Sequence, residues 1–173
     1  MKYQLAEAKQ ILERTPGVIR AMLHGLSDAW LSPNEGSDTW SPRDVVAHLV
    51  GMERAAWIPR VRHLLEFGEG RPFDPVDRTA EILASGHKSI AFLLDEFTFL
   101  RRDSLQVLST LKLSPRQLEQ TTVHPDFGVV RLNDLLATWV VHDLSHTAQI
   151  TRVLATQYKD EVGPWVQYLR VIR

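Results

Sequence analysis

Residues 135–155, LLATWVVHDLSHTAQITRVLA, contain the strongest structural signal in the chain. Their apolar residues recur at helical spacing, which predicts one long helix from about Leu132 to Tyr158. His142 and His146 lie one turn apart in this segment and therefore share one face of the helix. Two imidazoles in that arrangement can hold one divalent metal ion if a third ligand comes from elsewhere in the chain.

A second helix is expected to supply the third ligand, His48. Ser41 suits the N-cap of this helix, Pro42 suits its first position, and Asp44 occupies the capping-box position. The apolar pattern that follows continues the helix, and Pro59 is expected to kink it because proline lacks an amide hydrogen. Asp44 lies one turn before His48 and is a candidate for orienting its ring.

The rest of the chain is expected to form further helices with short connections. We expect a first helical region over Lys2–Leu31 that Thr15–Gly17 breaks or kinks, a third helix over Thr79–Leu111, a helical turn at Ser114–Gln117, a turn-rich connector at His124–Gly128, and a short helix from Gly163 to near Ile172. Four long amphipathic segments predict an all-α four-helix bundle with a short extra C-terminal helix, in a single domain over residues 1–173. Such bundles place metal sites in their core.

The composition fits one folded domain and argues against several classes of protein. The chain has 173 residues, of which 44% are hydrophobic and 24% charged, so it can bury a core without disulfides. Its 20 basic and 21 acidic side chains give a formal charge of −1, which argues against nucleic acid or an anionic membrane as a partner. The absence of cysteine excludes thiolate zinc ribbons and thiol nucleophiles. Because no apolar signal core or membrane-spanning run is present, the chain is expected in the cytoplasm.

Three imidazoles leave at least one coordination position of an ion open, which is the pattern of catalytic sites. We expect zinc or nickel at His48, His142 and His146, with iron or manganese as alternatives. The open position suits a water that is activated for hydrolysis or a thiolate that is held for transfer. A pair at this spacing also arises by chance among seven histidines, so a surface or core role without metal is the competing interpretation.

The other four histidines lack a partner at ligand spacing. His24, His63 and His87 are therefore expected to face solvent. His124 precedes a proline and is expected either to form a hydrogen bond within its turn or to lie at the mouth of the site. The five tryptophans are expected to serve as core and helix-cap anchors rather than as a substrate cage.

Acidic residues near the histidines have weaker patterns. Asp143 points about 100° away from His142 around the helix, so we expect it to cap another element or to pair at the surface. Three further carboxylates are candidates for lining the site, although no spacing marks them: Glu53, Asp95 and Glu96.

Two blocks of sequence resemble the DinB-like family of metal-binding four-helix bundles. The first is WSPRDVVAHL at residues 40–49, and the second is LLATWVVHDLSH at residues 135–146, which continues to Gln149. The resemblance implies an up-down-down-up bundle in which the three histidines named above hold a divalent metal. Members often place Thr near the start of the last long helix, whereas this chain has VRLN at residues 130–133, so Asn133 is the expected cap.

The resemblance also guides the functional expectation. It implies a metal-dependent enzyme, either a transferase that uses a low-molecular-weight thiol such as bacillithiol or mycothiol, or a hydrolase of a small molecule, and it implies a homodimer. The alternative is a non-catalytic metal-binding or ligand-sensing module, with a structural dimer as one form of it. A third hypothesis is an interaction protein that dimerises through a helix face, with the histidines incidental. Trp57, Leu64 and Phe67 are candidates for extending that face, although burial in the core is the favoured expectation for them.

Overall fold

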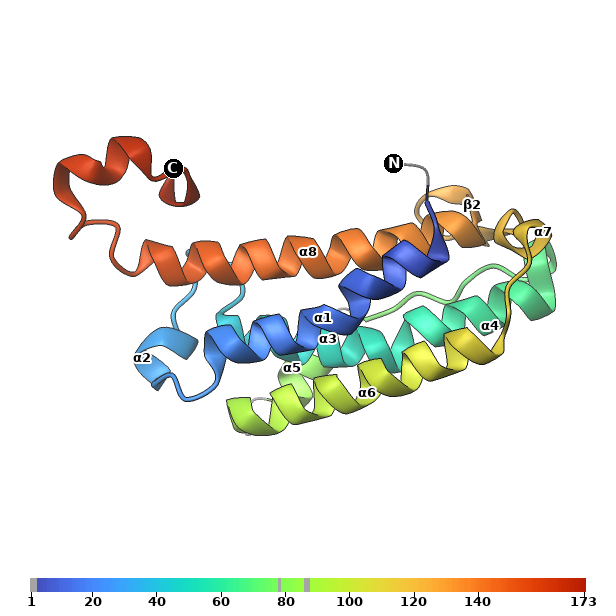
Figure 1. The fold of residues 1–173 in the computed structure, drawn as a ribbon, viewed down its shortest axis with the longest axis horizontal. Helices are drawn as coiled ribbons and strands as arrows, with labels where there is room; N and C mark the ends of the chain where they lie inside the picture. Colours follow the sequence, from blue (N-terminus) through green and yellow to red (C-terminus); the bar gives the residue numbers. More distant parts are fainter. Residues whose placement is uncertain (1–2, 78, 86–87) are drawn as a thin grey trace.

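The computed structural model describes residues 3–77, 79–85 and 88–173. Within these residues the bundle is built from four long helical stretches: α1 (Leu5–Leu23), α3 (Pro42–Ala55) continued by α4 (Trp57–Phe67), α6 (Ile90–Thr110) and α8 (Leu132–Thr156). α1 and α8 run in one direction, while α3 with α4 and α6 run in the other (Figure 1). The predicted all-α, up-down-down-up four-helix bundle is thus confirmed, with α8 ending two residues before the expected Tyr158.

Shorter elements connect and flank the four long stretches. They are α2 (Asp28–Leu31), η1 (Gly68–Gly70), α5 (Ala80–Ser85), α7 (Pro115–Leu118), the strands β1 (Thr121–His124) and β2 (Gly128–Arg131), and the 3-10 turns η2 (Gly163–Tyr168) and η3 (Arg170–Ile172). The long connection between α4 and α6 contains α5, which packs on α3. In the part of the chain that is described, no helix is both long and apolar enough to cross a membrane.

Local sequence signals explain where several helices begin. Ser41 and Asp44 form a complete capping box at the start of α3, as predicted, and Ser114 and Gln117 form another at α7. Pro59 disrupts the helix, as expected, but the interruption lies at Ala56, about one turn before the proline. It has no amide hydrogen to donate to the carbonyl of Ala55, and the helix is interrupted there, between α3 and α4.

Several boundaries differ from the sequence-based expectation. The predicted helix over 79–111 is two helices, because Ser89 caps a new start at α6, where its side chain accepts from the amide of Phe92. The expected connector at 124–128 is the turn of an antiparallel hairpin that pairs Thr121 with Arg131. The C-terminal helix is a pair of 3-10 turns. Asn133 is not the cap of α8, since Arg131 holds that position.

α1 passes through Pro16 instead of breaking there. The first helical region ends at Leu23, and α2 is a separate turn. Pro16 cannot donate to the carbonyl of Leu12, which is therefore left available inside the bundle. The guanidinium of Arg101 donates to this carbonyl at 2.9 Å, so the helix survives with its freed acceptor satisfied.

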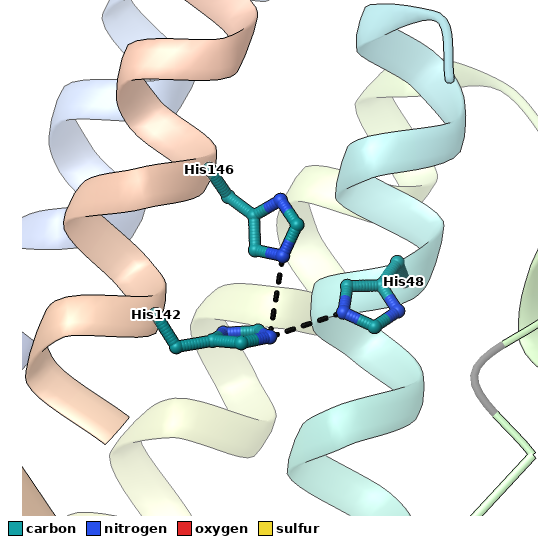
Figure 2. A group of neighbouring side chains, drawn as sticks. All are labelled: His48, His142 and His146. Carbon is teal, nitrogen blue, oxygen red and sulfur yellow. Dashed lines mark hydrogen bonds between the residues drawn. The ribbon is translucent and has the colours of Figure 1, made fainter. Parts of the chain in front are cut away.

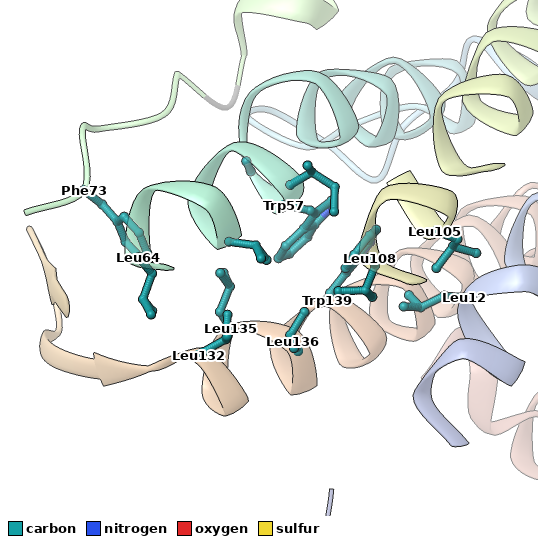
Figure 3. Packing of buried hydrophobic residues seen from close by; sticks show 13 residues of the cluster. Leu12, Trp57, Leu64, Phe73, Leu105, Leu108, Leu132, Leu135, Leu136 and Trp139 are labelled. Carbon is teal, nitrogen blue, oxygen red and sulfur yellow. The ribbon is translucent and has the colours of Figure 1, made fainter. Parts of the chain in front are cut away.

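The buried core of the described residues divides into two apolar clusters with a polar layer between them. Cluster 1 lies on the hairpin side and includes Leu12, Trp57, Leu64, Leu108 and Trp139, as Figure 3 shows. Cluster 2 lies on the α2 side and includes Ile19, Leu49, Leu93, Phe97 and Ile150. Buried polar residues separate the clusters along every long stretch: Thr15 on α1, Glu53 on α3, Arg101 on α6 and Asp143 on α8.

This core also tests the face suggested for pairing two copies. Trp57 and Leu64 belong to cluster 1 and are 3% and 0% exposed, so they are not available to a partner. Phe67, at the end of α4, is 39% exposed. Burial in the core, the favoured expectation, is therefore confirmed for Trp57 and Leu64, and only Phe67 is available to extend a pairing face.

Candidate metal centre

Three histidines from two helices converge between those helices (Figure 2). His48 lies on α3, and His142 and His146 lie on α8, which runs antiparallel to it. The Nε2 atom of His142 is 3.1 Å from Nε2 of His48 and 3.2 Å from Nε2 of His146. One ring nitrogen from each residue lies within 4.8 Å of the other two. The structure therefore brings together the three residues that the sequence singled out.

The two separations from Nε2 of His142 fit a shared cation. Metal–nitrogen bonds of about 2.0–2.1 Å place neighbouring ligand nitrogens roughly 2.8–3.4 Å apart in octahedral or tetrahedral geometry. Hydrogen bonds alone explain the cluster less well, because Nε2 of His142 can carry only one hydrogen but faces two ring nitrogens. A cation at the common point can accept a lone pair from all three rings.

Gln149 orients one of the rings. Its Oε1 atom lies 2.8 Å from Nδ1 of His146, so Nδ1 carries the hydrogen and the lone pair of Nε2 points into the cluster. Burial is the main cause that lowers the pKa of His146, which favours the neutral ring that binds metals. Residue spacing did not identify Gln149 as a functional residue. Its position three residues after His146 on α8 is the signal that predicts such a contact.

Aromatic rings enclose the cluster on two sides. The ring centroid of Trp40 lies 4.5 Å from that of His48 and 5.9 Å from that of His146, stacked on the latter. The ring of Trp57 lies 5.1 Å from that of His142. His48 is buried, whereas His142, His146 and Trp40 are only half-buried, so the site is reached from the side of these three. Two of the tryptophans predicted as anchors thus also form walls of the site.

The acidic residues around the site are engaged elsewhere. Asp44 accepts from the amide and the hydroxyl of Ser41 in the capping box, and its proposed role toward His48 stays a prediction. The expectation for Asp143 was wrong, because its carboxylate is fully buried and pairs with Arg101. Its side chain lies in the bundle interior, where Arg101 donates to both of its carboxylate oxygens. Glu53 is buried in the same ion cluster.

The two remaining carboxylate candidates form ion pairs that involve α6. Asp95 pairs with Arg20 of α1, and Glu96 pairs with Arg54 and Lys88. Their charges are thus balanced by neighbouring cations. Neither contact involves a histidine of the cluster.

The other histidines lie outside the cluster where they are described. His24 is exposed, as expected. His63 is half-buried instead, with its Nε2 atom 2.9 Å from the carbonyl oxygen of Arg71. His124 accepts from the amide of Asp126 at 3.1 Å, which confirms the hydrogen bond predicted within its turn. His87 lies outside the described residues.

An up-down-down-up bundle with three histidines converging from its second and last long stretches defines a distinct class of helical protein. Residues 11–150 match the model of the DinB superfamily, and the chain belongs to that superfamily. The structure is also similar to that of YfiT from Bacillus subtilis, described as a probable metal-dependent hydrolase with an unusual four-helix bundle topology. That similarity has a TM-score of 0.75 and 25% sequence identity, and it covers 94% of this chain and 90% of the other. No curated protein matches the chain.

Proposed function

We propose that this protein is a metal-dependent hydrolase that acts on a small molecule at the centre formed by His48, His142 and His146. The observation that carries the proposal is the convergence of three imidazoles, in which Nε2 of His142 lies 3.1 and 3.2 Å from Nε2 of His48 and His146, distances that suit ligands of one divalent ion. The structural relationship to YfiT, a probable metal-dependent hydrolase, supports the same class of reaction.

The chain supplies a neutral ligand set and a partly enclosed site. A divalent ion held by three imidazoles would activate a water and polarise the bond to be hydrolysed. Gln149 fixes the tautomer of His146, so that its Nε2 lone pair is available without a proton being displaced. Trp40 packs against the ring of His48 and Trp57 against the ring of His142, so both limit the access of bulk water to the site. Because imidazole suits several ions, zinc or nickel is proposed first and iron or manganese second.

Elemental analysis tests the metal centre directly. Untagged protein purified without added metal should contain about one divalent ion per chain, as three converging imidazoles hold a single ion. His146→Ala should lose this ion, because two imidazoles remain. His24→Ala is the matched control, since it removes an exposed histidine outside the cluster and should keep the ion. Full metal content in His146→Ala would reject the site.

A thiol transferase is the second candidate at the same centre. Thiolate is the form of sulfur that binds metals, and the open coordination position suits it as well as water. The metal-loaded protein should be assayed with carboxylic and phosphate esters, with and without low-molecular-weight thiols. Turnover without thiol supports hydrolysis, and strictly thiol-dependent turnover supports transfer. Stoichiometric metal with no turnover in either assay favours the non-catalytic metal-binding or ligand-sensing module.

Two further proposals concern the setting of the protein. A homodimer and a cytoplasmic location rest on the family resemblance and on the sequence. Light scattering of the purified protein at several concentrations measures the first, and fractionation of cells that express the native chain measures the second.

A further inference from the structure

Arg101 is the central residue of the polar layer, although its helix α6 contributes no histidine to the cluster. Its side chain is 2% exposed. Its Nη1 and Nη2 atoms donate to the two carboxylate oxygens of Asp143 at 2.5 and 3.0 Å. Its Nε atom donates to Oε1 of Glu53 at 2.8 Å. One guanidinium thus holds two buried carboxylates, and it also reaches the carbonyl of Leu12 on α1.

The two carboxylates lie on the helices that carry the histidines. Glu53 follows His48 on α3, and Asp143 directly follows His142 on α8. Because these helices run antiparallel, a link between Glu53 and Asp143 fixes how far one helix can slide along the other. The same slide sets the distance between His48 and the pair on α8.

A second series of contacts leads from Arg101 to the histidines through aromatic rings. The guanidinium carbon lies 5.1 Å from the ring centroid of Trp139, and the indole of Trp139 donates to Glu53 at 3.2 Å. Trp139 stacks on Trp57 with centroids 5.4 Å apart, and Trp57 packs against His142. The ion cluster therefore also supports one wall of the site.

We propose that Arg101 is a positioning residue of the three-histidine centre: by binding Glu53 and Asp143 together, it sets the register between α3 and α8 at which the three imidazoles can share one ion. This inference rests on the proposed metal centre. Metal–ligand distances tolerate deviations of only about 0.2 Å, so a small slide between the helices is enough to weaken binding. A planar guanidinium suits the role because its donors have a fixed geometry.

Cobalt(II) is a suitable probe, because the position and intensity of its visible absorption bands report the number and arrangement of its ligands. The test compares Co²⁺ affinity and spectrum in the wild-type protein, in Arg101→Met, and in the triple variant Arg101→Met, Glu53→Gln and Asp143→Asn. The triple variant leaves no buried charge without a partner, so it protects the fold if Arg101→Met alone does not fold. Helical content by circular dichroism verifies the fold of each variant.

Arg54→Met is the matched control. Arg54 also forms two ion pairs from α3, with Glu81 of α5 and Glu96 of α6, but these pairs do not join the two histidine helices. We expect this variant to bind Co²⁺ with the wild-type affinity and spectrum. The folded Arg101 variants should bind it at least about tenfold more weakly and with shifted bands, which is the scale seen when residues that support metal ligands are removed.

The outcomes separate this inference from the metal centre itself. If the wild-type protein does not bind Co²⁺, the proposed centre fails and the role of Arg101 fails with it. If the wild-type protein binds and the folded triple variant binds with unchanged affinity and spectrum, Arg101 is only structural and the inference is overturned, while the centre stands. Equal weakening in Arg54→Met would also overturn it, because the effect would not be specific to the link between α3 and α8.

Discussion

Two polar groups lie side by side between α3 and α8, and they differ in charge, burial and partners. The ion cluster of Arg101, Glu53 and Asp143 is buried and pairs opposite charges through several hydrogen bonds. The histidine cluster is partly open, and burial favours the neutral form of His146. Neighbours in sequence, His142 and Asp143, belong to different groups. The comparison indicates that one helix turn can carry a ligand for chemistry and an anchor for packing, on different faces.

The ion cluster contains two carboxylates but only one guanidinium. Burial raises the pKa of Glu53, and the neighbouring Arg101 opposes that shift. Arg101 is shared between two carboxylates, so neither carboxylate has a cation of its own. Its hydrogen bonds are nevertheless buried and charge-assisted, so removing a member of this cluster is expected to cost more stability than removing a histidine.

The largest effect is expected for Asp143→Ala. The change removes the two hydrogen bonds that the buried guanidinium of Arg101 donates to this carboxylate, although Glu53 still balances its charge. Because a hydrogen bond to a charged group contributes about 1.5–3 kcal/mol, the free energy of unfolding should fall by about 3–5 kcal/mol. Urea unfolding in the presence of a chelator measures it. Asp95→Ala is the control, because Asp95 also pairs with an arginine but is 73% exposed, and its loss should be within about 1 kcal/mol. Equal losses in the two variants would contradict a larger contribution to stability from the buried pair than from the exposed pair.

His142→Ala, one position earlier, should have the opposite profile. Its metal-free stability should stay within about 1 kcal/mol of the wild type, because no buried charge loses a partner. Zinc should no longer raise its melting temperature. In the wild type, free zinc at a hundred times its dissociation constant should add about 2.7 kcal/mol to the free energy of unfolding. Thermal unfolding with and without zinc measures both. A zinc shift of wild-type size would show that this residue is not a ligand.

Gln149→Ala sharpens the histidine side of the comparison. Loss of the acceptor for Nδ1 lets the His146 ring change tautomer and should weaken metal binding by about 10–100-fold while leaving the fold intact. Competition with a chromogenic chelator measures the affinity. Gln157→Ala, near the end of the same helix, should bind as the wild type does. Identical affinities for both variants would remove Gln149 from the site.

The smallest effect is expected at a third polar contact of α8, the ion pair between Glu35 and Arg152. The hydrogen bond from Arg152 lowers the pKa of Glu35 below its ordinary value of 4.5, so the pair stabilises the fold above that pH and the contribution is lost as pH falls through the lowered pKa. Glu35→Gln should cost less than about 1 kcal/mol at neutral pH, because such exposed pairs are weak. Urea unfolding at pH 7 and pH 3 measures it, and a difference from wild type that persists in acid would contradict the assignment.

The sequence was informative wherever local chemistry determines structure. The capping box at Ser41 and the helical spacing of His142 and His146 fixed the start of one helix and the face of another. The order of the bundle followed from the family resemblance. These features depend on neighbours within a turn or on blocks of sequence that resemble the family.

The features that were missed depend on contacts between distant residues. Arg101 stands in the run RRD at residues 101–103, which looks like a solvated helix face, and its partners come from α3 and α8. No neighbour of Asp143 in the sequence indicates that its carboxylate is buried against a cation from α6. The hairpin was missed because its strands are only four residues long, too short for an alternating pattern to be distinctive.

Pro16, a residue of low helix propensity, lets α1 accept a side-chain hydrogen bond in the middle of the helix. A regular helix offers its neighbours no free carbonyl along its middle, so a partner can slide past it by a turn with little penalty. The proline leaves one such oxygen, on Leu12, and Arg101 occupies it. Through Arg101, α1 is held at a defined position along α3, α6 and α8, although it carries no histidine of the cluster. The missing hydrogen bond at Pro16 thereby helps to set how the four long stretches are aligned.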